Sequence, residues 1–346
     1  MDLSPVVLTG ATGYLGSHIL KQLLEKGCEV RITTRNLEKT KQSNLMVSFL
    51  KDYEGKLSIF EANLLNEGDF DEVMRGAKSL VHAASPFKIE GIKDAKKELV
   101  DPAVIGTRNV LNSATKMGVE RVVQTSSIVA IYGDAVDVEL IEGDAFNEKH
   151  WNATSSISHQ PYNYSKTVAE KEALALSLTS PWRLVTINPG FILGPALVKR
   201  TDSTSVDFMM NLLNGKFSMG VPDMSFSVVD VRDVARAHIL GLEKDDIKGR
   251  FICSNESLNM LEMSNVLREK YGKKYKLAKS TLPKFVFYLF GPLIAGVTWA
   301  YIRKNVGYPL RFDNSKSKEV LGMEYRDVKS TLEEHAQQLI SDKLVS

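Results

Sequence analysis

Apolar positions along the first 190 residues follow two alternating patterns. Short, continuous apolar runs rich in β-branched residues predict strands that are buried on both faces. These runs occupy residues 5–9, 28–35, 56–62, 79–84, 121–127 and 182–189. Between them, apolar residues recur at helical spacing over residues 15–26, 70–76, 94–117 and 162–178. This alternation predicts an α/β fold with a Rossmann-type, doubly wound parallel sheet.

Beyond residue 190 the alternation loosens into shorter, mixed elements, which indicate a second and smaller unit. We expect a dinucleotide-binding domain over residues 1–190, to which residues 225–248 return. The smaller, substrate-binding domain comprises residues 191–224 and 249–346. It should lie over the carboxyl ends of the strands, where open α/β sheets bind their ligands.

The composition of the 346-residue chain narrows the class of protein. Its 43% hydrophobic and 25% charged residues are typical of a soluble globular protein with a large core. The 44 Lys and Arg are balanced by 42 Asp and Glu, so no basic excess indicates a nucleic-acid partner. Cys28 and Cys253 lie far apart in the sequence, and the six histidines lack metal-binding spacing. No secretory signal is visible. We therefore expect a cytoplasmic protein that binds no metal.

The first strand is followed at once by a glycine-rich turn, Gly10-Ala-Thr-Gly13-Tyr-Leu-Gly16. One glycine permits the sharp turn, one lets the backbone approach a pyrophosphate, and one lets helix and strand pack closely. The amino end of the helix then offers free N–H groups to the phosphates. The turn between a strand and a helix predicts a dinucleotide cofactor.

The end of the second predicted strand bears on the choice of cofactor. An acidic residue there would hydrogen-bond the ribose of NAD, whereas an arginine accommodates the 2′-phosphate of NADP. This strand ends in Thr-Thr-Arg35 without an acid, and Lys39 and Lys41 follow. Because a guanidinium binds phosphate through paired donors, we expect NADPH and NADP⁺ in preference to NAD(H).

Tyr162 and Lys166 are four residues apart on a predicted helix, so both can reach one site. A free phenol has a pKa of about 10, and a neighbouring cation would lower that pKa and make the tyrosine a usable acid. Ser127, at the end of the fifth predicted strand, would supply a second hydroxyl. The adjacent Ser126 is the alternative candidate for that hydroxyl.

Several segments together resemble the extended short-chain dehydrogenase/reductase family over essentially the whole chain. They are TGATGYLGS, VVQTSS, YNYSK, INPGFILGP and VVDVRDVARAH. The RITTRN stretch, the ASP after the fourth strand and the Trp151 region resemble its dihydroflavonol reductase and cinnamoyl-CoA reductase branch, which includes microbial aldehyde and ketone reductases. The resemblance implies that Tyr162 donates the proton, that Ser127 orients the carbonyl, and that Lys166 binds the nicotinamide ribose and tunes Tyr162.

The resemblance and the motifs together define the cofactor contacts that we expect. Ala83, Ala84 and Ser85 fall where the family passes backbone along the cofactor, and Asn188, Pro189 and Gly190 fall where it flanks the nicotinamide. The full set is Thr9, Gly10, Thr12, Gly13, Tyr14, Leu15, Gly16, Arg35, Asn63, Leu64, Ala83, Ala84, Ser85, Thr125, Tyr162, Lys166, Pro189 and Gly190.

Three positions depart from the family pattern. Asn63 stands where the family usually has an adenine-contacting Asp, and either side chain can accept from the amino group. Tyr132 occupies the place of a substrate-reading Asn in dihydroflavonol reductases. The cinnamoyl-CoA signature NWYCYGK is here QPYNYSK, which keeps the aromatic Tyr164 and loses the Trp. Neither named plant activity is therefore assigned from the sequence.

Substrate contacts are expected from loops after the strands, at Phe87, Ser127, Tyr132 and Phe191, and from residues 205–226. The aromatic and methionine residues there indicate an apolar, adaptable pocket. We expect an NADPH-dependent reductase of an aromatic or medium-sized apolar aldehyde or ketone. An NAD(P)-dependent 3β-hydroxysteroid-type dehydrogenase or a nucleotide-sugar epimerase is the alternative enzyme, and a non-catalytic NADP-binding redox sensor is the alternative of another class. Asp230 and Asp233 should stabilise a strand-helix junction.

Residues 285–302 carry no charge, and Gly291-Pro292 interrupts them, which predicts two short helices. We favour a packed element of the smaller domain over attachment to a membrane surface. The helices at 94–117 and 161–177 could pair two subunits, so a monomer and a homodimer both remain open.

Overall fold

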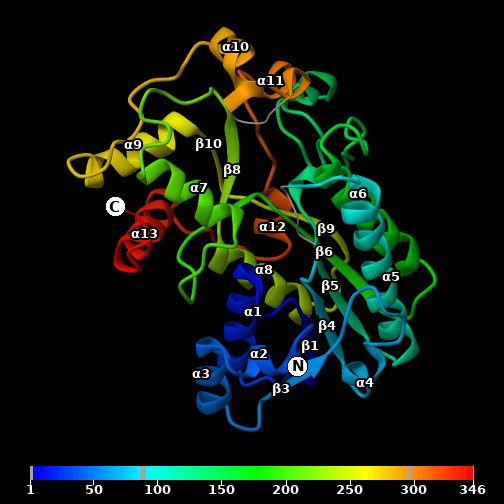
Figure 1. Ribbon diagram of the computed structural model, residues 1–346. Coiled ribbons are helices and arrows are strands. Elements are labelled where there is room, and N and C mark those ends of the chain that lie inside the picture. The colour runs from blue at the N-terminus through cyan, green and yellow to red at the C-terminus, as the bar shows by residue number, and fades with distance from the viewer. Residues whose placement is uncertain (1–2, 86–90, 295–297, 346) are drawn as a thin grey trace.

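Parallel strands form the centre of the molecule in a computed structural model that describes residues 3–85, 91–294 and 298–345 (Figure 1). Among these residues, the larger sheet has the strand order β3-β2-β1-β4-β5-β6-β9, and each strand is parallel to its neighbours. Its strands are β1 (Val6–Thr9), β2 (Val30–Thr34), β3 (Leu57–Glu61), β4 (Ser79–His82), β5 (Arg121–Thr125), β6 (Arg183–Pro189) and β9 (Gly249–Cys253). The order reverses beside β1, as in doubly wound folds. The predicted fold class is confirmed.

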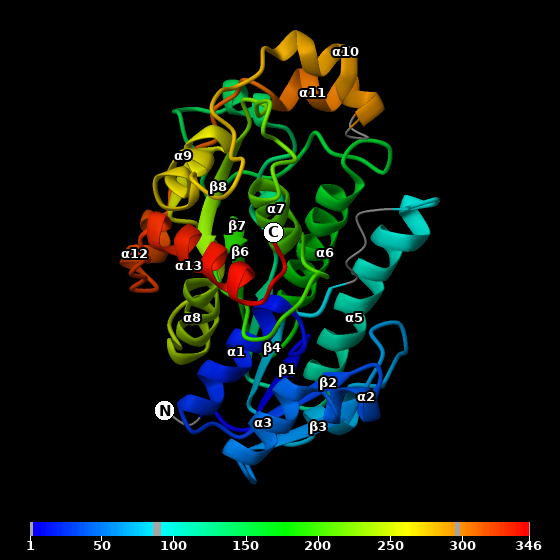
Figure 2. The same ribbon diagram turned by 60° about the vertical axis from the view of Figure 1, so that its left-hand side comes forward.

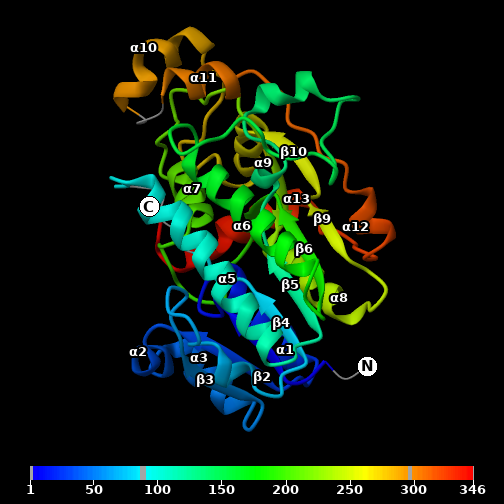
Figure 3. The same cartoon turned by 90° about the vertical axis from the view of Figure 1, so that its right-hand side faces the viewer.

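Helices cover both faces of this sheet (Figures 1 and 3). Val6 and Leu8 of β1 belong to the core under α1 and α8, whereas Val7 belongs to the core under α4 and α5. Because both faces are covered, the strands appear in the sequence as unbroken apolar runs. The helices of this part are α1 (Tyr14–Glu25), α2 (Leu37–Lys41), α3 (Asn44–Asp52), α4 (Asp71–Met74), the π-helical turn η1 (Lys96–Val100), α5 (Asp101–Lys116), α6 (Pro161–Ser177) and α8 (Val231–Glu243).

A smaller sheet lies beyond the carboxyl ends of the large one (Figure 1). It consists of β7 (Phe191–Leu193), β8 (Ser225–Asp230) and β10 (Glu256–Asn259), with β8 parallel to β7 and antiparallel to β10. An apolar core joins it to α7 (Thr204–Leu213), α9 (Met260–Tyr271) and α13 (Val328–Ser341). The remaining helices are the 3₁₀ turns η2 (Ile128–Ala130) and η3 (Ala135–Leu140), with α10 (Lys284–Ile294), α11 (Trp299–Asn305) and α12 (Ser315–Glu319).

Two strands lie in the opposite sheet from the one that the sequence suggested. Residues 249–253 were expected in the smaller domain, but β9 pairs with β6 in the large sheet. Residues 225–230 were expected to return to the dinucleotide-binding domain, but β8 belongs to the small sheet, and α8 packs on the large one. A buried apolar run predicts a strand, and the sheet that the strand joins is decided by contacts distant in sequence.

The uncharged stretch at 285–302 forms two short helices, as predicted, but the break lies elsewhere (Figure 2). Helix α10 continues through Gly291-Pro292, and α11 begins at Trp299. Pro292 has no N–H for the carbonyl of Tyr288 one turn earlier, and Trp299 Nε1 donates to that carbonyl at 2.8 Å. Phe285 and Leu289 are 63% and 62% exposed, so the element is only partly packed. No helix in the described part of the chain is both long and apolar enough to cross a bilayer.

Candidate active site

The glycine turn between β1 and α1 is compressed against neighbouring backbone. Gly10 has φ +75°, and Gly13 N–H donates to the Gly10 carbonyl at 3.0 Å. A Cβ atom on Gly10 would lie 2.8 Å from the backbone nitrogen of Ala84. No side chain caps the amino end of α1, so its first N–H groups lack side-chain partners. This turn forms the backbone cradle and open helix end that suit a pyrophosphate.

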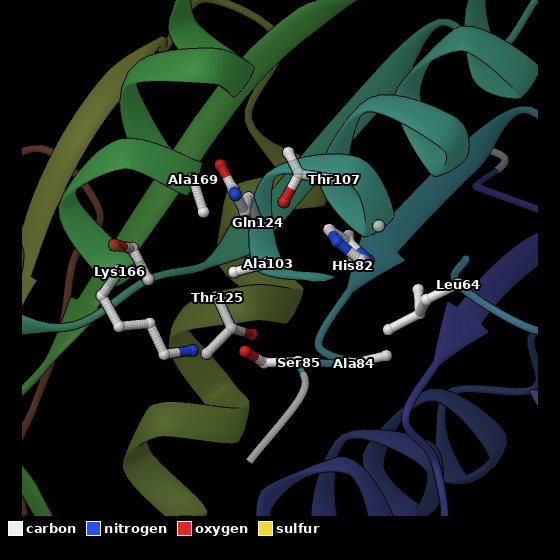
Figure 4. A pocket seen from close by; sticks show the side chains of 12 residues that line it. Leu64, His82, Ala84, Ser85, Ala103, Thr107, Gln124, Thr125, Lys166 and Ala169 are labelled. Atoms are coloured by element: carbon white, nitrogen blue, oxygen red, sulfur yellow. The ribbon is translucent and has the colours of Figure 1, made fainter. Parts of the chain in front are cut away.

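A small cavity lies beside this turn, between the ends of β4 and β5 and the helices α5 and α6 (Figure 4). Its lining includes five of the expected cofactor residues, namely Leu64, Ala84, Ser85, Thr125 and Lys166. Figure 4 shows Lys166 reaching across it from α6 towards Thr125 and Ser85. With the residues of α5, the cavity therefore brings together five separate segments of the chain.

Four further polar residues, His82, Thr107, Gln124 and Ser126, contribute to the wall of the cavity. Of these, the sequence pointed only to Ser126. Within the described residues, Gln124 Oε1 is a buried acceptor without a hydrogen-bond partner. The available signal was the presence of polar residues inside otherwise apolar strands, because buried polar groups are normally placed for a partner.

Three expected cofactor residues use their side chains inside the protein. Thr9 Oγ1 lies 2.9 Å from His82 Nδ1 and accepts from the Ala84 N–H. Tyr14 Oη donates to the Gly194 carbonyl, and Thr125 Oγ1 lies 2.7 Å from His238 Nε2. These side chains hold the turn, the strands and α8 together, which leaves main-chain atoms for any cofactor contact.

Arg35 follows the end of β2 directly, and its side chain is exposed. Among the described residues, no carboxylate forms an ion pair with it. Asn63 lies after β3, where its Oδ1 accepts from the Leu65 N–H at 3.1 Å. Arg35 is thus an available cation at the edge of the site, while Asn63 Oδ1 shapes its own turn.

Tyr162 and Lys166 lie one turn apart near the start of α6, with Lys166 Nζ 5.8 Å from the centre of the Tyr162 ring. Burial raises the pKa of Tyr162 to about 12 and lowers the pKa of Lys166 to about 8. The expectation that Lys166 lowers the pKa of Tyr162 is therefore wrong for this structure. At this separation the loss of hydration outweighs the attraction of the cation for the phenolate.

The structure separates the roles of the two adjacent serines after β5. Ser126 Oγ donates to the carboxylate of Glu170 and is buried. Ser127 Oγ makes a local contact, accepting from the Val129 N–H at 3.3 Å as the cap of η2. Because Ser126 is committed to a buried carboxylate, the arrangement favours Ser127 as the hydroxyl that faces a substrate.

Phe191 and Tyr132, two of the expected substrate residues, lie in separate aromatic clusters, one in the core of the small sheet and one beside β9. Phe191 packs against Phe208 and Phe226, with ring centres 5.1 and 5.2 Å away. Tyr132 packs against Phe146 and Phe312, with ring centres 5.6 and 5.5 Å away. The expected substrate residue Phe87 lies outside the described residues.

The segment between β6 and β7 and the start of α8 are both tightly constrained. Gly190 N–H donates to the Cys253 carbonyl at 3.0 Å, and a Cβ atom on Gly190 would lie 2.2 Å from the Ser227 carbonyl oxygen.

At the junction of β8 and α8, Asp230 caps α8 and pairs with Arg232. Asp233 accepts from the backbone N–H of Arg326. The predicted structural role of Asp230 and Asp233 at this junction is confirmed.

Comparisons with known proteins agree with this geometry. The model of the NAD dependent epimerase/dehydratase family matches residues 6–253. Cinnamoyl-CoA reductase CAD2 of Medicago truncatula is 37% identical over 270 residues, covering 77% of this chain and 80% of that protein. Dihydroflavonol 4-reductase of Callistephus chinensis is 30% identical over 277 residues, covering 78% of this chain and 74% of that protein.

Solved structures extend the similarity over almost the whole chain. Gre2 from Candida albicans in complex with NADPH superposes with a TM-score of 0.80 at 29% identity, covering 97% of this chain and 98% of that one. The yeast methylglyoxal/isovaleraldehyde reductase Gre2 complexed with NADPH superposes with a TM-score of 0.80 at 28% identity, covering 98% of both chains. This chain belongs to the NAD dependent epimerase/dehydratase family of extended short-chain dehydrogenases/reductases, in its dihydroflavonol reductase and cinnamoyl-CoA reductase branch.

Proposed function

We propose that this protein is an NADPH-dependent reductase that converts an aromatic or medium-sized apolar aldehyde or ketone to the alcohol. The observation that carries the proposal is the placement of Tyr162 and Lys166 on one face of α6, with Lys166 lining the cavity beside the glycine turn. An acid, a cation and a dinucleotide cradle thereby meet at the carboxyl ends of the strands, where ligands bind in open α/β sheets.

The residues of the site fit a dinucleotide. The bare amino end of α1 and the glycine turn would hold the pyrophosphate, and exposed Arg35 would pair with a 2′-phosphate. The Asn188 Oδ1 atom, beside Pro189 and Gly190, is a buried acceptor with no partner in the described part of the chain. When bound, NADPH supplies the hydride that reaches the carbonyl carbon.

The side chains then perform the proton chemistry. Tyr162 donates its hydroxyl proton to the carbonyl oxygen of the substrate as negative charge grows there. Its raised pKa keeps the hydroxyl protonated at neutral pH, which suits reduction. Ser127 donates a second hydrogen bond to the same oxygen, and the Lys166 ammonium favours the phenolate that remains.

The proposed substrate class rests on the apolar residues expected on the substrate side of the site. We propose that the aromatic groups around Phe191 and Tyr132 contribute ring faces and edges there. Such surfaces suit an apolar carbonyl compound better than a nucleotide sugar, whose hydroxyls require many polar partners. The retained Tyr162 and Lys166 also favour an enzyme over a redox sensor. We place this activity in a reducing cytoplasm, in which the buried Cys28 and Cys253, neither of them in a disulfide, stay as thiols.

The test follows NADPH oxidation by the purified protein against aromatic, aliphatic and dicarbonyl aldehydes and ketones. We expect turnover with several apolar members of the panel, together with product alcohol found by mass spectrometry. Tight NADPH binding without turnover of any member would refute the proposal and favour the sensor. Turnover of steroid alcohols or nucleotide sugars alone would favour the alternative enzymes.

A further inference from the structure

Glu170 is a carboxylate buried inside the protein, directly behind the proposed catalytic residues. Its side chain is 1% exposed, and it lies on α6 one turn after Lys166, bonded to Ser126 after β5 and to Asn188 of β6. Burying a carboxylate is costly unless every oxygen gains partners. Glu170 meets this condition with three donors: Ser126 Oγ and Asn188 Nδ2 on Oε2, and Arg250 Nε on Oε1.

Two of these donors enclose the peptide of Ser127. Ser126 precedes it in the chain, and its hydroxyl is fixed by Glu170. Asn188 Nδ2 lies 2.8 Å from Glu170 and also donates to the Ser127 carbonyl at 3.1 Å. The carboxylate therefore anchors the backbone of Ser127 from both sides and leaves the Ser127 hydroxyl outside the network.

The third donor connects this anchor to the end of the large sheet. Arg250 of β9 pairs with Glu170 at 2.5 Å, and its guanidinium stacks on Trp151 at 3.8 Å. One of its other nitrogens donates to the carbonyls of Glu148 and His150. The other donates to the carbonyl of Ala130, which lies in η2, the turn that Ser127 caps. The ion pair thus fixes the turn on which Ser127 sits.

Glu170 also provides a negative charge close to Lys166. The other titratable groups around Lys166 are Tyr162 on the same helix and His82 on β4. Burial lowers the pKa of His82 to about 4, so this imidazole is neutral at neutral pH. Burial lowers the pKa of Lys166, and the attraction of Glu170 opposes that change.

We propose that Glu170 is a positioning residue that fixes the peptide of Ser127 through Ser126 and Asn188 and keeps Lys166 in its ammonium form. This inference rests on the proposed function, because it assigns Ser127 and Lys166 their roles. It assigns no direct contact between Glu170 and a substrate.

The test measures the ionisation of Lys166 without requiring turnover. The protein is treated with acetic anhydride across a range of pH, and acetylation of Lys166 is quantified by peptide mass spectrometry. In Glu170→Gln we expect the midpoint of Lys166 labelling to move to lower pH by at least about 0.5 unit. Glu172→Gln, on the same helix but in an ion pair with Arg108, should leave the midpoint unchanged.

Turnover gives a second, independent measurement. With a carbonyl that the wild type reduces, Glu170→Gln should lower kcat at least tenfold and shift the alkaline limb of the kcat profile to lower pH. Glu170→Asp keeps the charge but shortens the reach, so it should lower kcat while retaining the Lys166 midpoint. If Glu170→Gln fails to fold, the kcat of Glu170→Asp decides the case.

A wild-type labelling midpoint or a wild-type kcat in Glu170→Gln, or a wild-type kcat in Glu170→Asp, would overturn the inference. Failure of the proposed function is separate, because it appears as a wild-type protein that reduces no carbonyl. The labelling comparison can still be made in that case, and it then tests only the effect of Glu170 on Lys166.

Discussion

Gly16 of α1 packs directly against the carbonyl of Gly10, so that a Cβ atom on Gly16 would lie 2.0 Å from that oxygen. Gly16→Ala must therefore displace the amino end of α1 from the turn. We expect a loss of about 1–3 kcal/mol in the free energy of unfolding, typical of overpacking, and at least tenfold weaker NADPH binding. Urea denaturation and NADPH fluorescence titration measure the two effects.

Gly27→Ala is the matched control at the other end of the same helix. Gly27 has φ +79°, and a Cβ atom on it would have no neighbour within 4 Å, so only backbone strain of about 1–2 kcal/mol is expected. NADPH affinity should be unchanged. Equal loss of cofactor binding in both variants would contradict the role assigned to the turn.

Removal of the Tyr162 hydroxyl tests the proposed acid. Tyr162→Phe should lower kcat by about 10²–10⁴-fold, the usual contribution of a positioned acid. NADPH should still bind, because the ring and Lys166 remain. Tyr164→Phe on the same helix is the control and should keep normal turnover. A Tyr162→Phe enzyme with near-normal kcat would remove Tyr162 from the mechanism.

Arg35 tests the preference for the phosphorylated cofactor. Arg35→Gln should weaken NADPH binding by about 10- to 100-fold, the effect of losing a charge-assisted hydrogen bond of about 1.5–3 kcal/mol. NADH binding should hardly change, and the exposed position makes a folding defect unexpected. Calorimetric titration with both cofactors gives the ratio. An unchanged ratio would show that the 2′-phosphate is recognised elsewhere.

Buried histidines should make the fold sensitive to acid. Burial lowers the pKa of His18, His82, His238 and His335 to about 4 each. In the unfolded chain the pKa is about 6.5, so their contribution to stability is complete above that pH and is lost as pH falls towards 4. At pH 5.5 each histidine should cost up to about 1.4 kcal/mol.

Urea denaturation at pH 7.5 and 5.5 measures this loss directly. His238→Gln, which removes one of the four groups, should show a smaller difference between the two pH values. Equal unfolding free energies of the wild type at both pH values would show that these rings are hydrated enough to titrate normally.

Sequence patterns were sufficient for six of the seven strands of the large sheet, all except β9, and for the elements that carry the candidate site. The runs around Val7, Val81 and Val123 are buried on both faces, so hydrophobicity alone identifies them. The glycine turn is equally local, since its constraints arise within residues 10–16 and from the adjacent strand.

The remaining features depend on contacts distant in sequence. Glu170 appears in the sequence as an ordinary polar residue of a helix, and only the fold brings Ser126, Asn188 and Arg250 to it. The pKa of Tyr162 could not be inferred from the spacing to Lys166, because spacing gives proximity but not the extent of burial. The continuation of α10 past Pro292 likewise could not be inferred, because the donor that replaces its missing N–H comes from Trp299 in the next helix.

The chain passes directly from a strand of the large sheet to a strand of the small sheet at two adjacent places, at Gly190 between β6 and β7 and at residues 254–255 between β9 and β10. It returns from β8 to β9 through α8. The two direct crossings are one or two residues long, and they are bonded to each other through Gly190 N–H and the Cys253 carbonyl. Connections this short hold the two sheets close together at this point. A fragment that stops at residue 190 would lack β9, expose the edge of β6 and invite aggregation. Domain exchange between relatives must therefore graft both direct crossings together with the return through α8.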